Sequence, residues 1–404
     1  MSSKAALLVI STLAAAASVW AAPYQQAHPG AQQMYSGEMR PDDVVWTMEH
    51  SDELFPVNRV APSSHAHPLP PAARKLGNIQ FTSNGQRCDL YDFLALDRVA
   101  GLLVLKDGKV AFEDYELGAG PDTHWYSASV AKSITSTLVA AAIQDGKIAS
   151  LDDPVGKYLP ALRTGAYAEV TLRNALQMAS GVQWDETYTS PTSDRRALLE
   201  LQLAHKPGSI LKFMSERHTA ARPGSVWLYN TGETFIVGAV VEAAVGQSLA
   251  EYLSKKIWSP WGMESAAKWW TESPGGTNFG GGGLSATLRD YARFGLFVMN
   301  DGVIDGRRVV PAGWFDEAGS RKRIGNNWVD YGYLWWVPPQ SQPIHRGAFE
   351  AEGIFGQYIY VNRRERVVIA VLSAQPKPTD MEPVSSEAFF AAVTEALKEP
   401  AEAH

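Results

Sequence analysis

A serine and a lysine stand three residues apart, at Ser129 and Lys132, where a long apolar stretch begins. On a helix, residues at this spacing lie one above the other on the same face, so the ammonium group comes within reach of the hydroxyl. Serine is a poor nucleophile until a base takes its proton. A lysine buried in a pocket can take that proton, because burial lowers its pKa toward neutrality. The pair therefore predicts nucleophilic catalysis.

The same spacing occurs twice more, at Ser209 and Ser265, each with a lysine three residues further on. An isolated match of this kind is typically a solvated lysine one turn from a surface serine. Only Ser129 begins a sustained helical pattern, which Gly146 ends. The free backbone N–H groups in the first turn also stabilise negative charge that develops there. We predict that Ser129 is the nucleophile.

The composition excludes several other classes of function. The net charge of -7 gives no reason to expect nucleic acid as a partner. Cys88 is the only cysteine, which excludes an internal disulfide. His65 and His67 could bind a metal, but they lack carboxylate partners and the chain holds no H-E-x-x-H motif, so we expect no metal site. A chain of 404 residues can bury a large core, as one domain or as two interlocked ones.

The N-terminus has the features of a secretory signal. Lys4 supplies a positive charge, residues 5–19 are apolar and rich in alanine, and small side chains precede a cleavage point after Ala21. The apolar run is short for a membrane span, which needs about 20 residues. An uncleaved N-terminal anchor is the alternative. We expect residues 1–21 to be removed and the mature protein to be periplasmic, without a stable membrane span.

The order of predicted elements is a hairpin, then helices, then strands and a final helix. The hairpin covers residues 101–115, a continuous buried strand covers 367–372, and further strands are predicted at 331–337 and 356–361. This order predicts an α+β fold in which one antiparallel sheet, flanked by helices, is split by an inserted all-helical domain. The predicted segments are an extended N-terminal arm at 22–80, the first part of the α/β domain with the nucleophile helix at 81–150, the helical domain at 151–285 and the second part of the α/β domain at 286–404.

Two further segments could complete a catalytic site. Tyr229 stands between a turn and a helix, where it can act as general base and acid if a neighbouring cation such as Lys132 lowers its pKa. Taken alone, it could equally be a half-buried aromatic residue. In the second segment, Gly353 and Gly356 interrupt a strand pattern, which marks either close approach of a ligand or a bulge at a sheet edge. An N–H group at that edge could pair with the Ser129 N–H group as an oxyanion hole.

These three segments, with the sequences around them over residues 95–375, resemble the serine β-lactamase superfamily, class C-like branch. Within that branch the chain is similar to 6-aminohexanoate-dimer hydrolases and related esterases. The resemblance implies the β-lactamase/transpeptidase-like fold and no cofactor. It implies these roles: Ser129 as nucleophile, Lys132 and Tyr229 as the proton-handling pair, the N–H groups of Ser129 and Ile354 as the oxyanion hole, Gly353 as the glycine of the family's K-T-G motif, and Tyr188, Asn278 and Trp336 as substrate-binding residues of the cleft.

The chain departs from the family's pattern at two motifs. Y-x-N is replaced by Tyr229-Asn230-Thr231, and K-T-G by Ala351-Glu352-Gly353. The missing lysine would help to hold the carboxylate of a β-lactam, and Glu352 is expected to repel it. We therefore predict a secreted serine hydrolase that cleaves small linear amides or carboxylic esters through an acyl-enzyme.

Several alternatives stay open at this point. The same site could belong to a β-lactamase, a D-Ala-D-Ala carboxypeptidase, a penicillin-binding sensor that does not turn over, or a binding module without catalysis. The absence of a G-x-S-x-G motif excludes the nucleophile elbow of α/β-hydrolases. The physiological substrate and the oligomeric state are not determined by these patterns.

Overall fold

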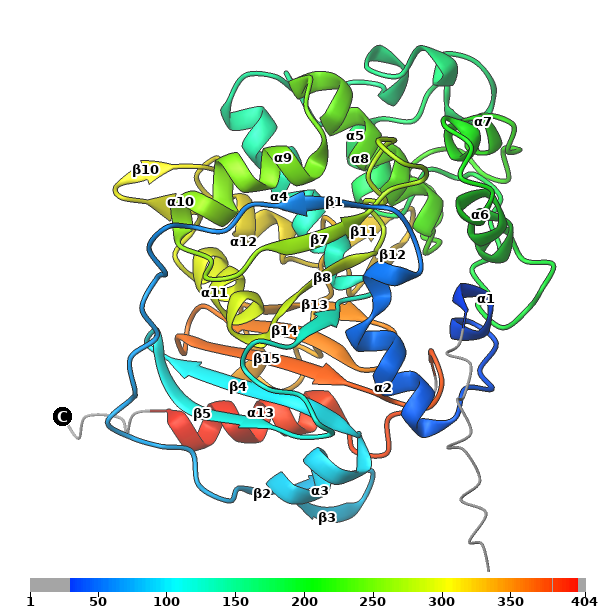
Figure 1. The fold of residues 1–404 in the computed structure, drawn as a ribbon. Helices are drawn as coiled ribbons and strands as arrows, with labels where there is room; N and C mark the ends of the chain where they lie inside the picture. The colour runs from blue at the N-terminus through cyan, green and yellow to red at the C-terminus, as the bar shows by residue number, and fades with distance from the viewer. Residues whose placement is uncertain (1–29, 380, 399–404) are drawn as a thin grey trace, which may run out of the picture.

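The computed structural model describes residues 30–379 and 381–398 (Figure 1). The predicted signal peptide, residues 1–21, lies outside these residues. Within them, no single helix is long and apolar enough to cross a bilayer. Two consecutive helices, Thr231–Val245 and Leu249–Trp261, would together be long and apolar enough to cross a bilayer, but they meet at a bend of 69°.

A five-stranded antiparallel sheet forms the lower half of the molecule as Figure 1 shows it. Its strands follow the order β13 (Ala348–Gly353), β14 (Gln357–Asn362), β15 (Val367–Ser373), β4 (Val99–Lys106) and β5 (Lys109–Tyr115). The hairpin β4–β5 and the strands β14 and β15 confirm the predictions for residues 101–115, 356–361 and 367–372. The sheet therefore joins a segment before the nucleophile helix to segments near the C-terminus.

Helices cover both faces of this sheet, which explains why its central strands are continuously apolar. Helix α11 (Leu288–Met299) packs on one face and α13 (Ser386–Leu397) on the other. Successive side chains of a strand point to opposite faces. In β15, Val368 and Ala370 belong to the core under α11, whereas Val367 and Ile369 belong to the core under α13.

A second, four-stranded antiparallel sheet lies above the first and was not predicted. It has the order β1 (Val57–Val60), β7 (Ala267–Trp270), β8 (Leu284–Thr287) and β6 (His124–Tyr126). Each of its strands has at most four residues, so none gave a clear periodic pattern. The sheet matters for the site because β6 leads directly into the nucleophile helix.

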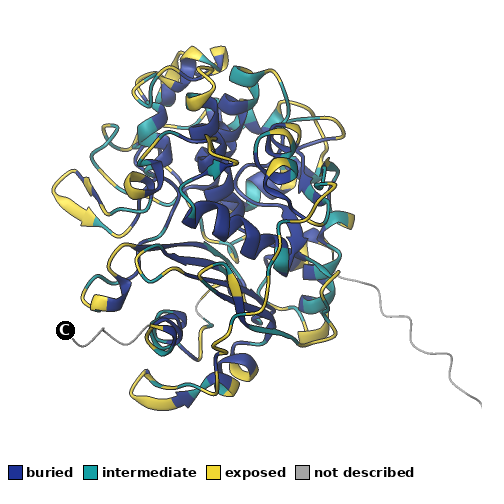
Figure 2. Cartoon of the chain, turned by 90° about the vertical axis from the view of Figure 1, so that its left-hand side faces the viewer, coloured by how far each residue is buried: buried dark blue, intermediate teal, exposed yellow. Residues whose placement is uncertain are grey.

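The helical part surrounds one helix that is almost wholly buried. Helix α4 (Val130–Gln144) packs against α8 (Thr231–Val245) and against β13, and its residues 130–142 are all buried (Figure 2). Burial on every side requires more than one apolar stripe, and α4 meets this with small residues such as Ala140 and Ala141. The rigid core of the molecule thus supports the first turn of α4.

Two predictions of local structure are wrong. Residues 22–80 were expected to form an extended arm, but within them lie α1 (Ala31–Met34), α2 (Pro41–Glu49) and β1, which pairs with β7. Residues 331–337 were expected to form a strand, but Leu334 has a φ of +60°, which turns the chain. Only isolated bridges remain there, and the side chains of Tyr331, Tyr333 and Trp335 lie in the hydrophobic core. The division into domains stays a prediction.

Candidate active site

A sharp turn between β6 and α4 places Ser129. The N–H group of Ser127 donates to the carbonyl oxygen of Leu284 at 2.9 Å, which fixes the end of β6 on the neighbouring strand. Ala128 then adopts a φ of +47°, and Ser129 occupies the N-cap position of α4. A left-handed non-glycine residue is strained, and such strain is concentrated at functional sites. The turn presents the Ser129 side chain at the wall of a pocket.

Lys132 meets Ser129 as the spacing predicts. Its Nζ atom lies 2.9 Å from Ser129 Oγ and donates to the carbonyl oxygen of Gly281 at 2.7 Å. The side chain is 2% exposed, and burial lowers the pKa of Lys132 to about 7. Near neutral pH a large fraction of this lysine is therefore uncharged and can accept the Ser129 proton.

The other two serine–lysine pairs do not form such a site. Lys212 forms an ion pair with Glu216, and its side chain is 70% exposed. Lys268 lies in β7 and forms an ion pair with Asp52. Of the three copies, only the one in α4 brings the hydroxyl and the ammonium group together.

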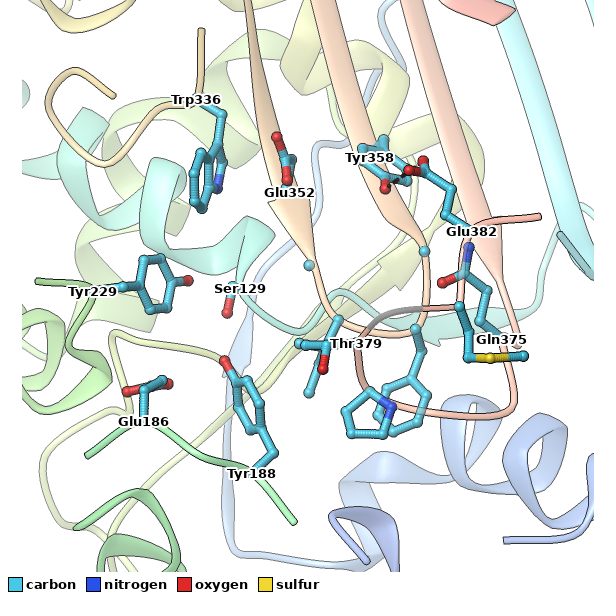
Figure 3. A pocket seen from close by; sticks show the side chains of 16 residues that line it. Ser129, Glu186, Tyr188, Tyr229, Trp336, Glu352, Tyr358, Gln375, Thr379 and Glu382 are labelled. Atoms are coloured by element: carbon cyan, nitrogen blue, oxygen red, sulfur yellow. Dashed lines mark hydrogen bonds between the residues drawn. The ribbon is translucent and has the colours of Figure 1, made fainter. Parts of the chain in front are cut away.

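Tyr229 lies beside this pair, but its pKa is not what we predicted. Its ring centroid is 5.0 Å from Lys132 Nζ, and its hydroxyl points toward the Ser129 side chain (Figure 3). Burial, followed by the charge of Glu186, raises the pKa of Tyr229 above its ordinary value. The prediction that Lys132 lowers this pKa is wrong, and Tyr229 is a neutral phenol that donates protons rather than a phenolate base.

The end of β13 packs directly against the nucleophile turn. A Cβ atom added to Gly353 would lie 2.4 Å from the carbonyl oxygen of Ser127 and 3.1 Å from the backbone nitrogen of Ser129. Only glycine allows this approach. Ile354 follows immediately and lines the same pocket as Ser129. The predicted oxyanion-hole residues are thus brought together.

The pocket at Ser129 has a volume of about 430 Å³. Figure 3 shows the hydroxyl groups of Tyr188 and Tyr229 directed toward Ser129. Trp336 stacks on Tyr229, with ring centroids 5.8 Å apart. Tyr188 and Trp336 therefore lie in the pocket wall, as predicted.

Asn278 does not line this pocket, so that prediction is wrong. Its side chain is fully buried and donates to the carbonyl oxygens of Trp269 and Trp270, each at 3.2 Å. Its side-chain oxygen accepts from Asn58 at 3.1 Å. Asn278 therefore joins β1 to β7, and the polar residue type alone could not distinguish this role from substrate contact.

Glu352 lies in the pocket wall, but its charge differs from the expected one. Burial, followed by the carboxylates of Glu382 and Glu387, raises the pKa of Glu352 to about 8. Its strand neighbour Glu350 is 2% exposed, and burial likewise raises its pKa. At neutral pH Glu352 is mostly protonated, so the expected repulsion of a substrate carboxylate is weak. The protonation of Glu352 does not replace the lysine of the family's K-T-G motif, whose place Ala351 takes.

Two charged residues of the site were missed in the sequence. Glu186 lines the pocket and accepts hydrogen bonds from Trp184 Nε1 and from both the backbone and the hydroxyl of Thr231. Arg195, from α6 (Asp194–Leu203), lines a small second cavity that also touches Ser129. Neither belongs to a recognisable motif. Their position depends on loops and helices that pack from a distance in sequence.

Comparisons with known proteins agree with this architecture. The beta-lactamase family matches residues 97–392. The chain is 28% identical to the 6-aminohexanoate-dimer hydrolase of Paenarthrobacter ureafaciens over 349 residues, which are 82% of this chain and 86% of that protein. It is 31% identical to Esterase EstB of Burkholderia gladioli over 150 residues, which are 35% and 38% of the two chains.

A solved structure is similar over nearly the whole chain. It is a protein from Bacillus anthracis, provisionally assigned as a 6-aminohexanoate-dimer hydrolase, and it superposes with a TM-score of 0.75 at 25% identity, covering 91% of this chain and 96% of that one. The match to the family over most of the chain, together with this shared fold, shows that the protein belongs to the beta-lactamase family of serine hydrolases.

Proposed function

We propose that the protein hydrolyses linear amides or carboxylic esters through an acyl-enzyme on Ser129. The observation that carries this proposal is the buried Lys132 Nζ atom, 2.9 Å from Ser129 Oγ, with a pKa lowered to about 7. A base with a pKa near the working pH combines a useful uncharged fraction with sufficient basicity. The similarity to a 6-aminohexanoate-dimer hydrolase and to an esterase supports the same reaction class.

In the acylation step, uncharged Lys132 takes the Ser129 proton while Oγ attacks the substrate carbonyl carbon. The N–H groups of Ser129 and Ile354 stabilise the oxyanion of the tetrahedral intermediate. Tyr229 then donates its phenolic proton to the leaving amine or alcohol, and the Lys132 ammonium group reprotonates Tyr229. The raised pKa of Tyr229 suits this donor role, because the phenol carries its proton at the start of the reaction.

In the deacylation step, water takes the place of the leaving group. It loses a proton to the Tyr229/Lys132 pair and attacks the ester carbonyl of the acyl-enzyme. Ser129 recovers a proton as it leaves, which restores the starting state. Every proton transfer uses groups already within the site, so the reaction requires no cofactor.

A β-lactamase or D-Ala-D-Ala carboxypeptidase reaction at the same site is the second candidate. The fold admits it, since a β-lactamase of Pseudomonas fluorescens is 26% identical over 178 residues. The segment Ala351-Glu352-Gly353 argues against it, because no cation stands where β-lactam-binding relatives carry one. The linear amides and esters that we propose do not require that cation.

A substrate panel on wild-type and Ser129→Ala protein tests the proposal. The panel contains p-nitrophenyl esters, short linear amides and nitrocefin, and a fluorophosphonate probe reports the nucleophile. We expect labelling and ester or amide turnover by the wild type, and neither by the variant. Labelling of the wild type without turnover would indicate a penicillin-binding sensor. The absence of both labelling and turnover would indicate a binding module without catalysis. Faster turnover of nitrocefin than of any ester would indicate a β-lactamase.

We also propose that the protein is exported. The proposal rests on the signal-like residues 1–21 alone. Intact-mass analysis of periplasmic protein should give a chain that begins at Ala22. Recovery of residues 1–21 in a membrane fraction would contradict it.

A further inference from the structure

Arg195 is a buried cation near the nucleophile that forms no ion pair among the described residues, although the charge of Glu186 acts on it without direct contact. It lies in α6, and its side chain is 3% exposed. The guanidinium carbon is 4.4 Å from the ring centroid of Tyr35 and 5.8 Å from those of Tyr188 and Phe279. Among the described residues, the one hydrogen bond of its guanidinium group is donated by Nη2 to Tyr35 Oη at 2.6 Å. Its Nε and Nη1 atoms have no hydrogen-bond partner among the described residues.

A second buried arginine shows what a structural guanidinium looks like in this protein. Arg293 is also 3% exposed, but it forms ion pairs with Asp290 and Glu264, both at 2.8 Å. A buried charge is normally paired, because its desolvation is otherwise uncompensated. None of the ion pairs formed by the described residues includes Arg195. Stacking on aromatic rings offsets part of that cost but leaves two N–H donors without acceptors.

Arg195 also lines a small cavity that reaches the nucleophile. The cavity is lined by Arg195, Ser129, Ile354 and Thr231, and its volume of about 10 Å³ is roughly that of one water molecule. Tyr188 lines both this cavity and the larger pocket, so its ring forms part of the wall between them. Tyr188 is in a segment without helix or strand structure, whose side chain can turn more easily than one in the core.

We propose that Arg195 forms a carboxylate-binding subsite next to Ser129, which selects substrates with a carboxylate on the acyl chain. The inference rests on the proposed function, because it concerns the substrate of the same serine. When Tyr188 turns away, the small cavity joins the larger pocket, and the carboxylate accepts hydrogen bonds from the free N–H groups of Arg195.

The larger pocket makes the inference specific. Its acidic lining residues are Glu186, Glu352 and Glu382, of which Glu352 has a raised pKa, and no lysine or arginine is among the residues that form its wall. Apart from Lys132, which is hydrogen-bonded to Ser129 and serves as the base, Arg195 is therefore the cation that a substrate carboxylate can reach beside the nucleophile. A substrate with an ammonium group would instead be held by the acidic residues of the larger pocket. Binding at Arg195 and binding in the larger pocket therefore predict opposite preferences for the charge of the substrate.

Matched p-nitrophenyl esters test this preference. One series carries a terminal carboxylate, as in the mono-esters of succinate, glutarate, adipate and pimelate. The second series is neutral and of equal length, and the third ends in an ammonium group. We expect kcat/KM for the best carboxylate ester to exceed that of its neutral counterpart by about tenfold to a hundredfold, the usual effect of a charge-assisted contact. Equal rates, or a preference for the ammonium series, would overturn the proposal.

Variants of Arg195 identify the source of the preference. Arg195→Met should bring the ratio of kcat/KM for the carboxylate ester to kcat/KM for the neutral ester close to one. Arg195→Lys should keep part of the preference, which a purely stacking role would not do. Lys212→Gln removes an exposed positive charge and should leave the ratio unchanged. A fall in the ratio with Lys212→Gln equal to that with Arg195→Met would overturn the proposal.

A binding measurement separates this inference from the proposed reaction. In Ser129→Ala protein, hexanoate should raise the melting temperature more than hexanamide does at equal ionic strength, and Arg195→Met should abolish the difference. Equal effects of the two ligands would overturn the subsite even if ester hydrolysis proceeds as proposed. Hydrolysis that survives Ser129→Ala would instead refute the reaction, whatever hexanoate does.

Discussion

Replacing Gly353 by alanine perturbs the site through one methyl group. The added Cβ atom would lie 2.4 Å from the carbonyl oxygen of Ser127, 3.0 Å from the Cβ atom of Ala128 and 3.1 Å from the nitrogen of Ser129. The first distance is too short for any real contact, and two of the three neighbours are backbone atoms that cannot rotate away. The end of β13 must therefore move back from the nucleophile turn.

That movement separates the two proposed oxyanion donors, the N–H groups of Ser129 and Ile354. Loss of one such donor costs about a hundredfold to a thousandfold in kcat, so we expect Gly353→Ala to lower kcat by at least about a hundredfold. Overpacking of this kind costs about 1–3 kcal/mol of stability, which leaves the protein folded.

The assay is steady-state hydrolysis of a p-nitrophenyl ester, accompanied by the rate of fluorophosphonate labelling and a thermal melt. Gly120→Ala is the matched control, because its added Cβ atom would meet no atom within 4 Å and its φ is not in the left-handed region. We expect wild-type kcat from the control. A folded Gly353→Ala protein with wild-type kcat would refute the assignment of this strand end to the oxyanion hole.

Three further predictions concern the proton path and the substrate. Lys132→Ala and Tyr229→Phe should each lower kcat by at least about a hundredfold. Because the two residues act as a unit, the double variant should lower kcat little more than the worse single variant does. Fully additive losses in a double-mutant cycle would contradict this. Because uncharged Lys132 is the base and its pKa is lowered to about 7, kcat/KM should fall as the pH decreases through that value; a pH–rate profile that stays flat from pH 8 to about pH 5 would exclude this role. The kcat/KM for penicillin should be about tenfold to a hundredfold lower than that for short esters, because the contact of a lysine with the substrate carboxylate, worth about 1.5–3 kcal/mol, is missing. Ala351→Lys with Glu352→Thr should raise kcat/KM for β-lactams relative to esters. A kcat/KM for benzylpenicillin equal to that of the best ester would contradict this prediction.

Local patterns were sufficient to predict the elements that carry the nucleophile. The Ser129/Lys132 spacing, the apolar run of α4 and the alternating hairpin β4–β5 each lie within a short stretch of sequence, and each formed as predicted. The order of the elements predicted that the hairpin and the apolar run at 367–372 belong to one sheet, but not that β4 and β15 are neighbours in it.

Features that depend on distant packing could not be predicted in this way. The second sheet joins β1, β6, β7 and β8, four short strands from widely separated segments, and local periodicity does not report such pairing. Asn278 had a suitable residue type for the cleft, but burial among backbone carbonyls gave it another role.

The protonation states of the site residues could not be predicted from the sequence either. The raised pKa of Tyr229 and the protonation of Glu352 near neutral pH both result from burial, which residue types do not show. That the buried Arg195 forms no ion pair among the described residues likewise follows from packing, which residue types do not show. These are the features that govern the proposed chemistry most strongly.

The covalent intermediate on Ser129 gives the most direct test of the account. Rapid quenching during turnover of a slow ester, followed by intact-mass analysis and peptide mapping, should show one acyl group on the peptide that contains Ser129. Ser129→Ala should show no adduct and no hydrolysis, with stability within about 1 kcal/mol of wild type. An acyl group on Ser209 or Ser265, or unchanged hydrolysis by Ser129→Ala, would contradict the central claim.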